Sequence, residues 1–260
     1  METIRTKDII PVDLNCVLSG VEFSLSYLHA VVNSDGGDKT HATKARHFEV
    51  LARQRLSDID ALFWNNKVGF WCDFDLTRNE VQAEYYASSF FPLWIYSTFT
   101  EKETSINSGR AFETIKKLGV LDFSGGLPTS LIESGEQWDF PNAWPPLQHI
   151  AVEAMDPKRP SSCPQNGLNK TNGLSSSSSA DMQQSGKEVA RRFLENAFIS
   201  WKKTGNMYEK YDVTEYGKAG HGGEYDVQEG FGWTNGVILD FLAKYGHELT
   251  APKIDEKINV

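Results

Sequence analysis

The chain is organised around one glycine-rich stretch near its C-terminus, Gly220-His-Gly-Gly-Glu-Tyr-Asp-Val-Gln-Glu-Gly-Phe-Gly-Trp-Thr-Asn-Gly236, which follows Met207-Tyr-Glu-Lys-Tyr-Asp-Val213. Acidic and aromatic residues are interleaved in both segments, and glycines let a backbone approach a ligand closely. Aromatic rings can cover the apolar C–H faces of a ligand, while carboxylates accept hydrogen bonds from its hydroxyl groups. This combination indicates an uncharged, hydroxyl-rich ligand such as a sugar. The alternative is an acidic surface loop that is only solvated.

The length, net charge and residue composition of the chain argue against several kinds of partner. The 260 residues can bury one substantial core or two small ones, and a formal net charge of −9 argues against nucleic acid or an anionic membrane surface. The three cysteines show no CxxC spacing, and His41 and His47 have no evident partner ligands, so we expect no metal site and no cofactor. The first residues lack signal-peptide features and no apolar run reaches ~18 residues, so no membrane span is expected and the compartment stays open.

Two long helices are predicted at the start of the chain, after an extended Ile9-Ile10. Pro11 disfavours a helical Ile10, and Asp13 can cap the first helix. Apolar residues recur every three or four positions along it and form its expected buried face, which consists of Leu14, Val17, Leu18, Val21, Leu25, Leu28 and Val32. The second helix begins near Thr40, and its stripe consists of Ala45, Phe48, Leu51, Ala52, Leu56, Ile59 and Leu62.

The middle of the chain alternates loops with shorter helices. Residues 63–75 read as a short aromatic hairpin with its turn at Asn65-Asn66, or as an aromatic loop that joins helices. Further helices are predicted over about 84–99 and 104–118. A long aromatic and polar loop follows. Pro145 then begins a helix that runs to about Met155, since the first helical turn needs no backbone donors there.

Residues 156–187 are poor in apolar side chains and read as a disordered low-complexity insertion. A helix resumes near Lys187, and its apolar face consists of Val189, Phe193, Ala197 and Trp201. The last helix is predicted from Trp233 to Tyr245, with residues 247–260 as a tail. The whole reads as an all-α fold of about seven helices in antiparallel pairs, with long aromatic loops at the helix ends.

Two longer motifs carry a resemblance to a family. Gln137-Trp-Asp-Phe-Pro-Asn-Ala-Trp-Pro-Pro146 resembles the second signature of the trehalases, glycoside hydrolases of family 37. Glu209-Lys-Tyr-Asp212 and Gly222-Gly-Glu-Tyr-x-x-Gln-x-Gly-Phe-Gly-Trp-Thr-Asn-Gly236 are similar to the family's C-terminal motifs, and Gly125-Gly-Leu-Pro-Thr-Ser130 also matches it. The motifs occur in family order, and the resemblance spans nearly the whole chain except 156–187. It corresponds to the C-terminal half of a trehalase.

The resemblance implies an (α/α)6 barrel, or α/α toroid, of which only the C-terminal part is present. Residues 1–155 would form part of the helical barrel and 188–246 its last part with the catalytic loop, separated by the insertion 156–187 and followed by the tail 247–260. It also implies hydrolysis of α,α-trehalose to two glucose molecules with inversion. In such chemistry a carboxylic acid protonates the glycosidic oxygen, and a carboxylate roughly 6.5–9.5 Å away activates a water.

The same resemblance implies roles for individual residues. Glu209 matches the general base, and Glu224 is implied to bind a sugar hydroxyl. Trp138 and Trp233 are candidate pocket walls, with core packing at a helix end as the alternative for each. Gln137 could donate a hydrogen bond to a sugar hydroxyl. Asp139, by contrast, could either bind a hydroxyl or tie down its own loop.

The sequence departs from the family pattern in one respect that leaves more than one functional interpretation open. The family's general acid is an aspartate in a Gly-Trp-Asp-Phe-Ser-like stretch upstream of the segment matching Thr3-Ile-Arg-Thr6, so we expect it to be missing here, together with the substrate-gripping arginines. The first interpretation is the base-bearing half of a trehalase whose partner is the missing N-terminal half. The alternative is an inactive fragment that binds sugar or regulates an intact trehalase, and an unrelated helical scaffold is a third possibility.

Overall fold

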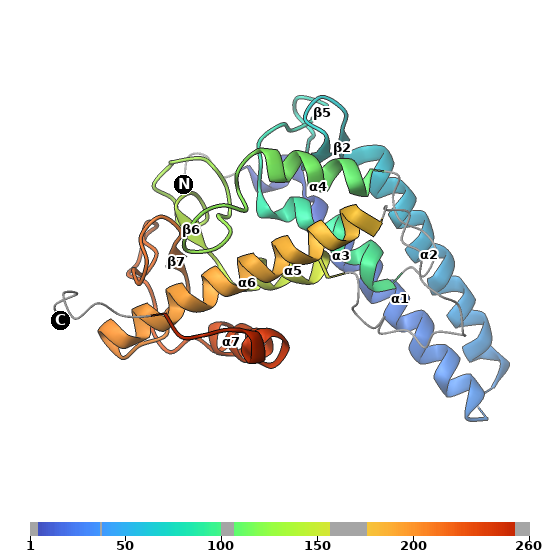
Figure 1. The fold of residues 1–260 in the computed structure, drawn as a ribbon. Coiled ribbons are helices and arrows are strands. Elements are labelled where there is room, and N and C mark those ends of the chain that lie inside the picture. The colour runs from blue at the N-terminus through green and yellow to red at the C-terminus, as the bar shows by residue number, and fades with distance from the viewer. Residues whose placement is uncertain (1–4, 37, 100–106, 157–175, 253–260) are drawn as a thin grey trace. The chain divides into compact units, whose positions relative to one another are not determined.

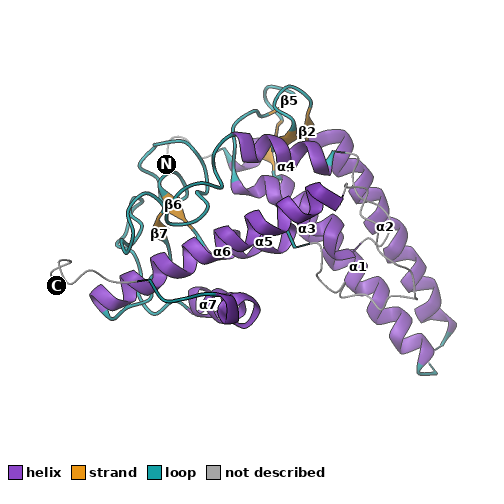
Figure 2. Ribbon diagram, in the orientation of Figure 1, coloured by secondary structure: helices purple, strands orange, loops and turns teal. Residues whose placement is uncertain are grey.

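The computed structural model describes residues 5–36, 38–99, 107–156 and 176–252. Figures 1 and 2 show an all-α architecture, with seven α-helices in the described part of the chain. The helices are α1 (Val12–Ser34), α2 (Lys39–Phe63), α3 (Phe90–Phe99), α4 (Ser108–Lys117), α5 (Pro145–Ala154), α6 (Ser176–Thr204) and α7 (Gly232–Tyr245). Every strand has two residues: β1 (Ile9–Ile10), β2 (Trp64–Asn65), β3 (Phe70–Trp71), β4 (Phe74–Asp75), β5 (Glu80–Val81), β6 (Asn142–Ala143) and β7 (Tyr211–Asp212). None of the described helices is long and apolar enough to cross a membrane.

The chain divides into two compact units that do not follow the expected boundaries. Met1–Ala83 and Ser88–Thr114 belong to the first unit, and Glu84–Ala87, Ile115–Asp156 and Ser176–Val260 belong to the second. Residues 1–155, expected as one part of the barrel, are therefore shared between the units. The reason is that α5 packs with the two helices that follow it, α6 and α7, more than with the N-terminal helices.

In the first unit, α1 packs along α2 (Figure 1). The face of α1 that is buried differs from the one expected. The buried residues of α1 are Val12, Cys16, Ser19, Gly20 and Phe23, whereas most of the expected stripe is exposed. Small residues let the two helices approach closely, and the hydroxyl of Ser19 donates to the carbonyl oxygen of Ala52 at 3.2 Å. The periodicity predicted the helix correctly, but it could not show that small residues line the contact.

The start of α1 differs from the prediction in a similar way. Helix α1 begins at Val12, so Asp13 lies in the first turn instead of capping it. The backbone N–H of Val12 donates to the carboxylate of Asp73 at 2.8 Å, which is a partner distant in sequence. A short aromatic hairpin is present, because β2 pairs with β3 and places Trp64 opposite Trp71. Its turn lies at residues 66–69, one residue later than expected, since Asn65 belongs to β2 and pairs with Phe70.

In the second unit, α6 begins earlier than expected. Residues 176–187, assigned to the disordered insertion, form the first turns of α6, while 157–175 lie outside the described residues. Tertiary contacts explain the difference. The ammonium of Lys116 pairs with both carboxylate oxygens of Asp181 at 2.6 and 2.7 Å, and a Cβ on Gly186 would lie 3.0 Å from Cβ of Met155. A serine-rich composition cannot reveal such partners.

The core of the second unit lies between α5, α6 and α7, around Val152, Phe193 and Phe241. Helix α5 begins at Pro145 and α7 ends at Tyr245, both as predicted. Strands β6 and β7 pair antiparallel and place Asn142 opposite Asp212. This pairing joins the two loops that carry the sequence motifs, 125–144 and 207–231, into one assembly.

Candidate active site

The loop assembly is braced by buried amide side chains. Asn142 accepts a hydrogen bond from the N–H of His221 at 2.9 Å and donates to the carbonyl oxygen of Asp139 at 2.9 Å. Asn196 on α6 donates to the carbonyl oxygens of Gly125 and Asp212. The two bonds of Asn196 tie both loops to the same helix, α6.

Three tryptophans form a cluster at the centre of the assembly. Trp138 stacks on Trp144 with 3.8 Å between ring centroids, and Trp144 meets the ring of Trp233 edge-on at 5.5 Å. Trp144 is buried, whereas Trp138 is 46% exposed. Trp138 is therefore an exposed aromatic surface stacked on a buried tryptophan, whereas Trp233 is only partly exposed. Such a surface suits the apolar face of a sugar ring.

The backbone of Glu209 is hydrogen-bonded to this tryptophan cluster. Its backbone N–H donates to the carbonyl oxygen of Gln228 at 3.0 Å, and its own carbonyl oxygen accepts from the indole nitrogen of Trp233 at 3.1 Å. The side chain is 2% exposed, and its Oε1 has no hydrogen-bond partner among the described residues. A buried acceptor left unpaired costs roughly 1–3 kcal/mol, which calls for an explanation beyond stability.

Gln137 shares this property. Its Oε1 is also buried without a hydrogen-bond partner in the described chain, while its carbonyl oxygen accepts from the indole nitrogen of Trp144 at 2.9 Å. The tryptophan cluster thus links the backbones of Gln137 and Glu209, because Trp144 binds one and Trp233 binds the other. Each residue thus has a buried side-chain oxygen without a partner among the described residues, and a backbone carbonyl oxygen bound by a tryptophan of the cluster.

Asp139 has the structural role that the sequence left open. Its carboxylate accepts hydrogen bonds from the hydroxyl groups of Ser130 at 2.6 Å and Ser134 at 2.5 Å. These contacts lie within its own loop. Asp139 therefore ties the loop down, and its two carboxylate oxygens are already engaged.

Glu224 lies apart from the buried residues, on an exposed loop that reaches Gln137 through its glycines. Gly222 and Gly223 have φ of +86° and +87°, a region that side chains disfavour. A Cβ on Gly222 would lie 2.5 Å from the carbonyl oxygen of Gly135, and one on Gly223 would lie 2.8 Å from Cβ of Gln137. The carboxylate of Glu224 is exposed next to this contact.

Two residues of the site were not singled out from the sequence. Trp144 belongs to the same motif as Trp138, and its position before two prolines was a signal that could have been used. Lys210 follows Glu209 directly, and it is 1% exposed. Lysine is seldom buried without a partner, so its sequence position alone gave no sign of this.

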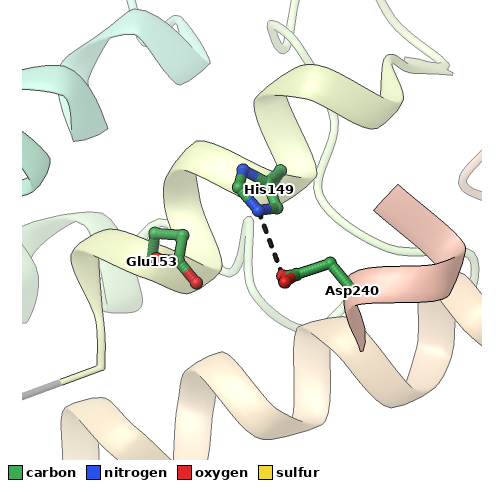
Figure 3. A group of neighbouring side chains, drawn as sticks. All are labelled: His149, Glu153 and Asp240. Atoms are coloured by element: carbon green, nitrogen blue, oxygen red, sulfur yellow. Dashed lines mark hydrogen bonds and ion pairs between the residues drawn. The ribbon is translucent and has the colours of Figure 1, made fainter. Parts of the chain in front are cut away.

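A network of ion pairs joins α5 to α7 beside the cluster (Figure 3). The Nε2 atom of His149 lies 3.1 Å from a carboxylate oxygen of Asp240, and Glu153 lies one turn along α5. These three groups have ligand atoms within 4.8 Å of one another, an arrangement that could hold a cation. The ammonium of Lys244 already pairs with Glu153 and lies 3.5 Å from Asp240. The network therefore pins α7, and with it Trp233, to α5.

The sequence of the chain is similar to those of known proteins of one family. The sequence profile of the trehalase family matches residues 1–246. A trehalase of Pimpla hypochondriaca is 36% identical over 245 residues, which cover 94% of this chain and 37% of that protein. A trehalase of Homo sapiens is 35% identical over 248 residues, which cover 95% and 37% respectively. The chain thus spans little more than a third of the length of these relatives.

Solved structures show the same fold. The neutral trehalase of Saccharomyces cerevisiae superposes with a TM-score of 0.60 at 20% identity, covering 91% of this chain and 38% of that one. A mannosylglycerate hydrolase from Thermus thermophilus gives a TM-score of 0.55 at 16% identity, covering 91% and 45%. These likenesses confirm the helical fold of the (α/α)6 toroids for this chain.

Proposed function

The chain belongs to the trehalase family, and on this premise we propose that it carries the general-base side of a site that hydrolyses α,α-trehalose to two glucose molecules. One observation carries the proposal. Glu209 is buried, its backbone is fixed on both sides by Gln228 and Trp233, and its Oε1 accepts no hydrogen bond from any described residue. A carboxylate held in this way can accept the proton of a water molecule.

The chemistry is a single displacement at the anomeric carbon. Glu209 takes a proton from water, and the resulting oxygen attacks the anomeric carbon on the face opposite the glycosidic oxygen. The bond to that oxygen breaks as a carboxylic acid protonates it, so one glucose leaves and the other is released with inverted configuration. Because water must fit between the two carboxyl groups, they are expected roughly 6.5–9.5 Å apart.

The remaining predicted residues are proposed to bind the sugar. Trp138 offers an exposed aromatic face, and the buried Oε1 of Gln137 is an acceptor without a partner among the described residues. Trp233 contributes mainly by fixing Glu209 and the cluster. Glu224, exposed beside Gln137, is proposed to accept hydrogen bonds from hydroxyl groups.

The proton donor is proposed to come from outside residues 1–260. Asp139, the acidic residue of the tryptophan-bearing motif, has both carboxylate oxygens engaged by serine hydroxyl groups. Because the chain aligns with only 37% of its relatives' length, activity of the chain by itself is a separate question from the role of Glu209.

The test is glucose release from trehalose. Residues 1–260 are assayed alone and together with the portion of a trehalase relative that this chain does not cover, either fused or co-expressed. We expect no turnover from 1–260 alone, turnover from the combination, and loss of turnover in Glu209→Gln, whose amide cannot take a proton from water. Glu215→Gln, an exposed change on the same segment, is the matched control and should retain wild-type turnover.

The outcomes separate the two interpretations. A Glu209→Gln enzyme that turns over near the wild-type rate would remove Glu209 as the base. Trehalose binding by 1–260, followed by tryptophan fluorescence, without turnover in any combination would favour the sugar-binding or regulatory alternative. Inversion is checked by proton NMR of the fresh products, which should contain one α-glucose and one β-glucose for each trehalose cleaved.

A further inference from the structure

We infer that Lys210 is a positioning residue of this site: its buried ammonium holds the glycine-rich loop 220–224 against the tryptophan cluster and thereby sets the affinity for the sugar. The inference rests on the proposed function for its effect on sugar, but the positioning itself is a property of the loop. The ammonium of Lys210 contacts loop carbonyl oxygens and the ring of Trp144, so the role inferred for it differs from that proposed for Glu209, its neighbour in sequence.

The contacts of the ammonium define this role. Nζ of Lys210 donates to the carbonyl oxygens of two successive loop residues, His221 at 3.0 Å and Gly222 at 3.2 Å. It also lies 5.3 Å from the ring centroid of Trp144, within range of a cation–π interaction. One ammonium group thus connects two carbonyl oxygens of the loop to the ring of Trp144.

The stem of the same side chain fits the loop closely. A Cβ on Gly220 would lie 2.8 Å from Cγ of Lys210, so the glycine is needed for the stem to pass. The backbone carbonyl oxygen of Lys210 also accepts from the N–H of Gly220 at 3.0 Å. Lys210 therefore engages three successive loop residues, from both its backbone and its side chain.

The buried charge is costly for a purely structural residue. Taking an ammonium out of water is unfavourable unless hydrogen bonds compensate, and a hydrophobic side chain of similar size would avoid that cost. Burial lowers the pKa of Lys210, while the carboxylate of Glu209 acts in the opposite direction. The ammonium can orient the loop carbonyl oxygens, which an apolar side chain cannot do.

The orientation of the loop matters because of what it carries. The N–H of His221 donates to Asn142, and that of Gly223 donates to the carbonyl oxygen of Gly135. These bonds lay the loop against Gln137, and Glu224 follows directly. Without Lys210 the carbonyl oxygens of His221 and Gly222 would lose their ammonium donor, and the loop could move away from Gln137 and the sugar.

The experiment compares Lys210→Met with Lys218→Met, a change of an exposed lysine in the same segment. The first readout is amide hydrogen exchange over residues 220–224, with α5 as an internal reference. The second is the split between KM and kcat for trehalose in the combined enzyme. Loss of two hydrogen bonds to a charged donor predicts about 10-fold faster exchange in the loop and a KM about 10-fold higher, with kcat changed less.

Each result of these measurements either supports or contradicts the role inferred for Lys210. Wild-type exchange in the loop of Lys210→Met overturns the inference whether or not trehalose is a substrate. Faster exchange in Lys210→Met with an unchanged KM would overturn the inferred effect on sugar affinity. A wild-type enzyme that neither binds nor cleaves trehalose would overturn the proposed function, while the exchange result would still decide whether Lys210 positions the loop. Lys210→Arg, which keeps the charge, should restore most of the protection. If Lys210→Met does not fold, Lys210→Gln is measured in the same way.

Discussion

The indole nitrogen of Trp233 donates a hydrogen bond to the backbone carbonyl oxygen of Glu209 at 3.1 Å. This bond ties the first turn of α7 to the residue proposed as the base. Because α7 is itself pinned to α5 through Asp240 and His149, the position of Glu209 depends on helices well outside its own loop. The structure therefore predicts that a change on α7 affects catalysis without touching the carboxylate.

Trp233→Phe tests this relationship, because it keeps an aromatic ring but removes the donor. A typical hydrogen bond contributes roughly 0.5–1.5 kcal/mol, so kcat for trehalose in the combined enzyme should fall about 2- to 10-fold. Trp201→Phe, a change of an exposed tryptophan on α6, is the control and should leave kcat unchanged. Equal rates for the two variants would show that the bond does not position the base.

Asp139→Asn separates anchoring of the loop from proton donation. If Asp139 only ties its loop to Ser130 and Ser134, the variant should unfold more easily, by about 1–3 kcal/mol, while its folded fraction cleaves trehalose at nearly the wild-type rate. Urea unfolding and glucose release measure the two quantities. A variant of wild-type stability that has lost turnover would instead identify Asp139 as the acid.

The sequence predicted the elements of this fold better than their contacts. Apolar periodicity located α1, α2 and α7, and the two prolines located the start of α5. These signals are local, since they depend on which residues can follow one another in a helix. The two motifs also led to Glu209 and Gln137, which have the two unpaired buried oxygens of the loop assembly.

What the sequence missed depends on partners far away in the chain. The buried face of α1 includes the small residues Cys16, Ser19 and Gly20, and the first turns of α6 are held by Lys116. Lys210 could not be recognised because its burial follows from the path of loop 220–224. No local pattern records these contacts, so tertiary packing overrode both periodicity and composition.

The exposed stripe of α1 leads to a prediction about association. Leu14, Val21 and Leu28 are each about half exposed, and a row of apolar side chains of this kind favours association. Residues 1–260 should therefore self-associate in solution. Changing all three to Gln should shift the chain towards monomer in light scattering without lowering its melting temperature. Leu76→Gln removes a similarly exposed leucine elsewhere and should leave association unchanged.

Asp73 and Asp75, two residues apart, are expected to influence stability in opposite directions. Burial raises the pKa of Asp73 to about 6, against the effect of the Val12 N–H. Hydrogen bonds from Arg5 and Thr77 lower the pKa of Asp75 below its ordinary value. The guanidinium of Arg5 reaches both carboxylate oxygens of Asp75, at 2.9 and 3.0 Å. The surroundings of Asp73 therefore disfavour its charged form, whereas those of Asp75 favour its charged form.

The sign of each effect follows from proton binding. The folded chain binds the Asp73 proton more tightly than the unfolded chain, whose aspartates titrate near pH ~3.9, so this group lowers the free energy of unfolding as pH rises from about 4 to 6. Asp75 contributes stability above pH ~3.9, and that contribution is lost as pH falls below it. Asp73→Asn should therefore be more stable than wild type at pH 7, and Asp75→Asn less stable. Urea unfolding from pH 3 to 7 measures both, and a destabilised Asp73→Asn at pH 7 would mean that its carboxylate is needed in charged form to hold the start of α1.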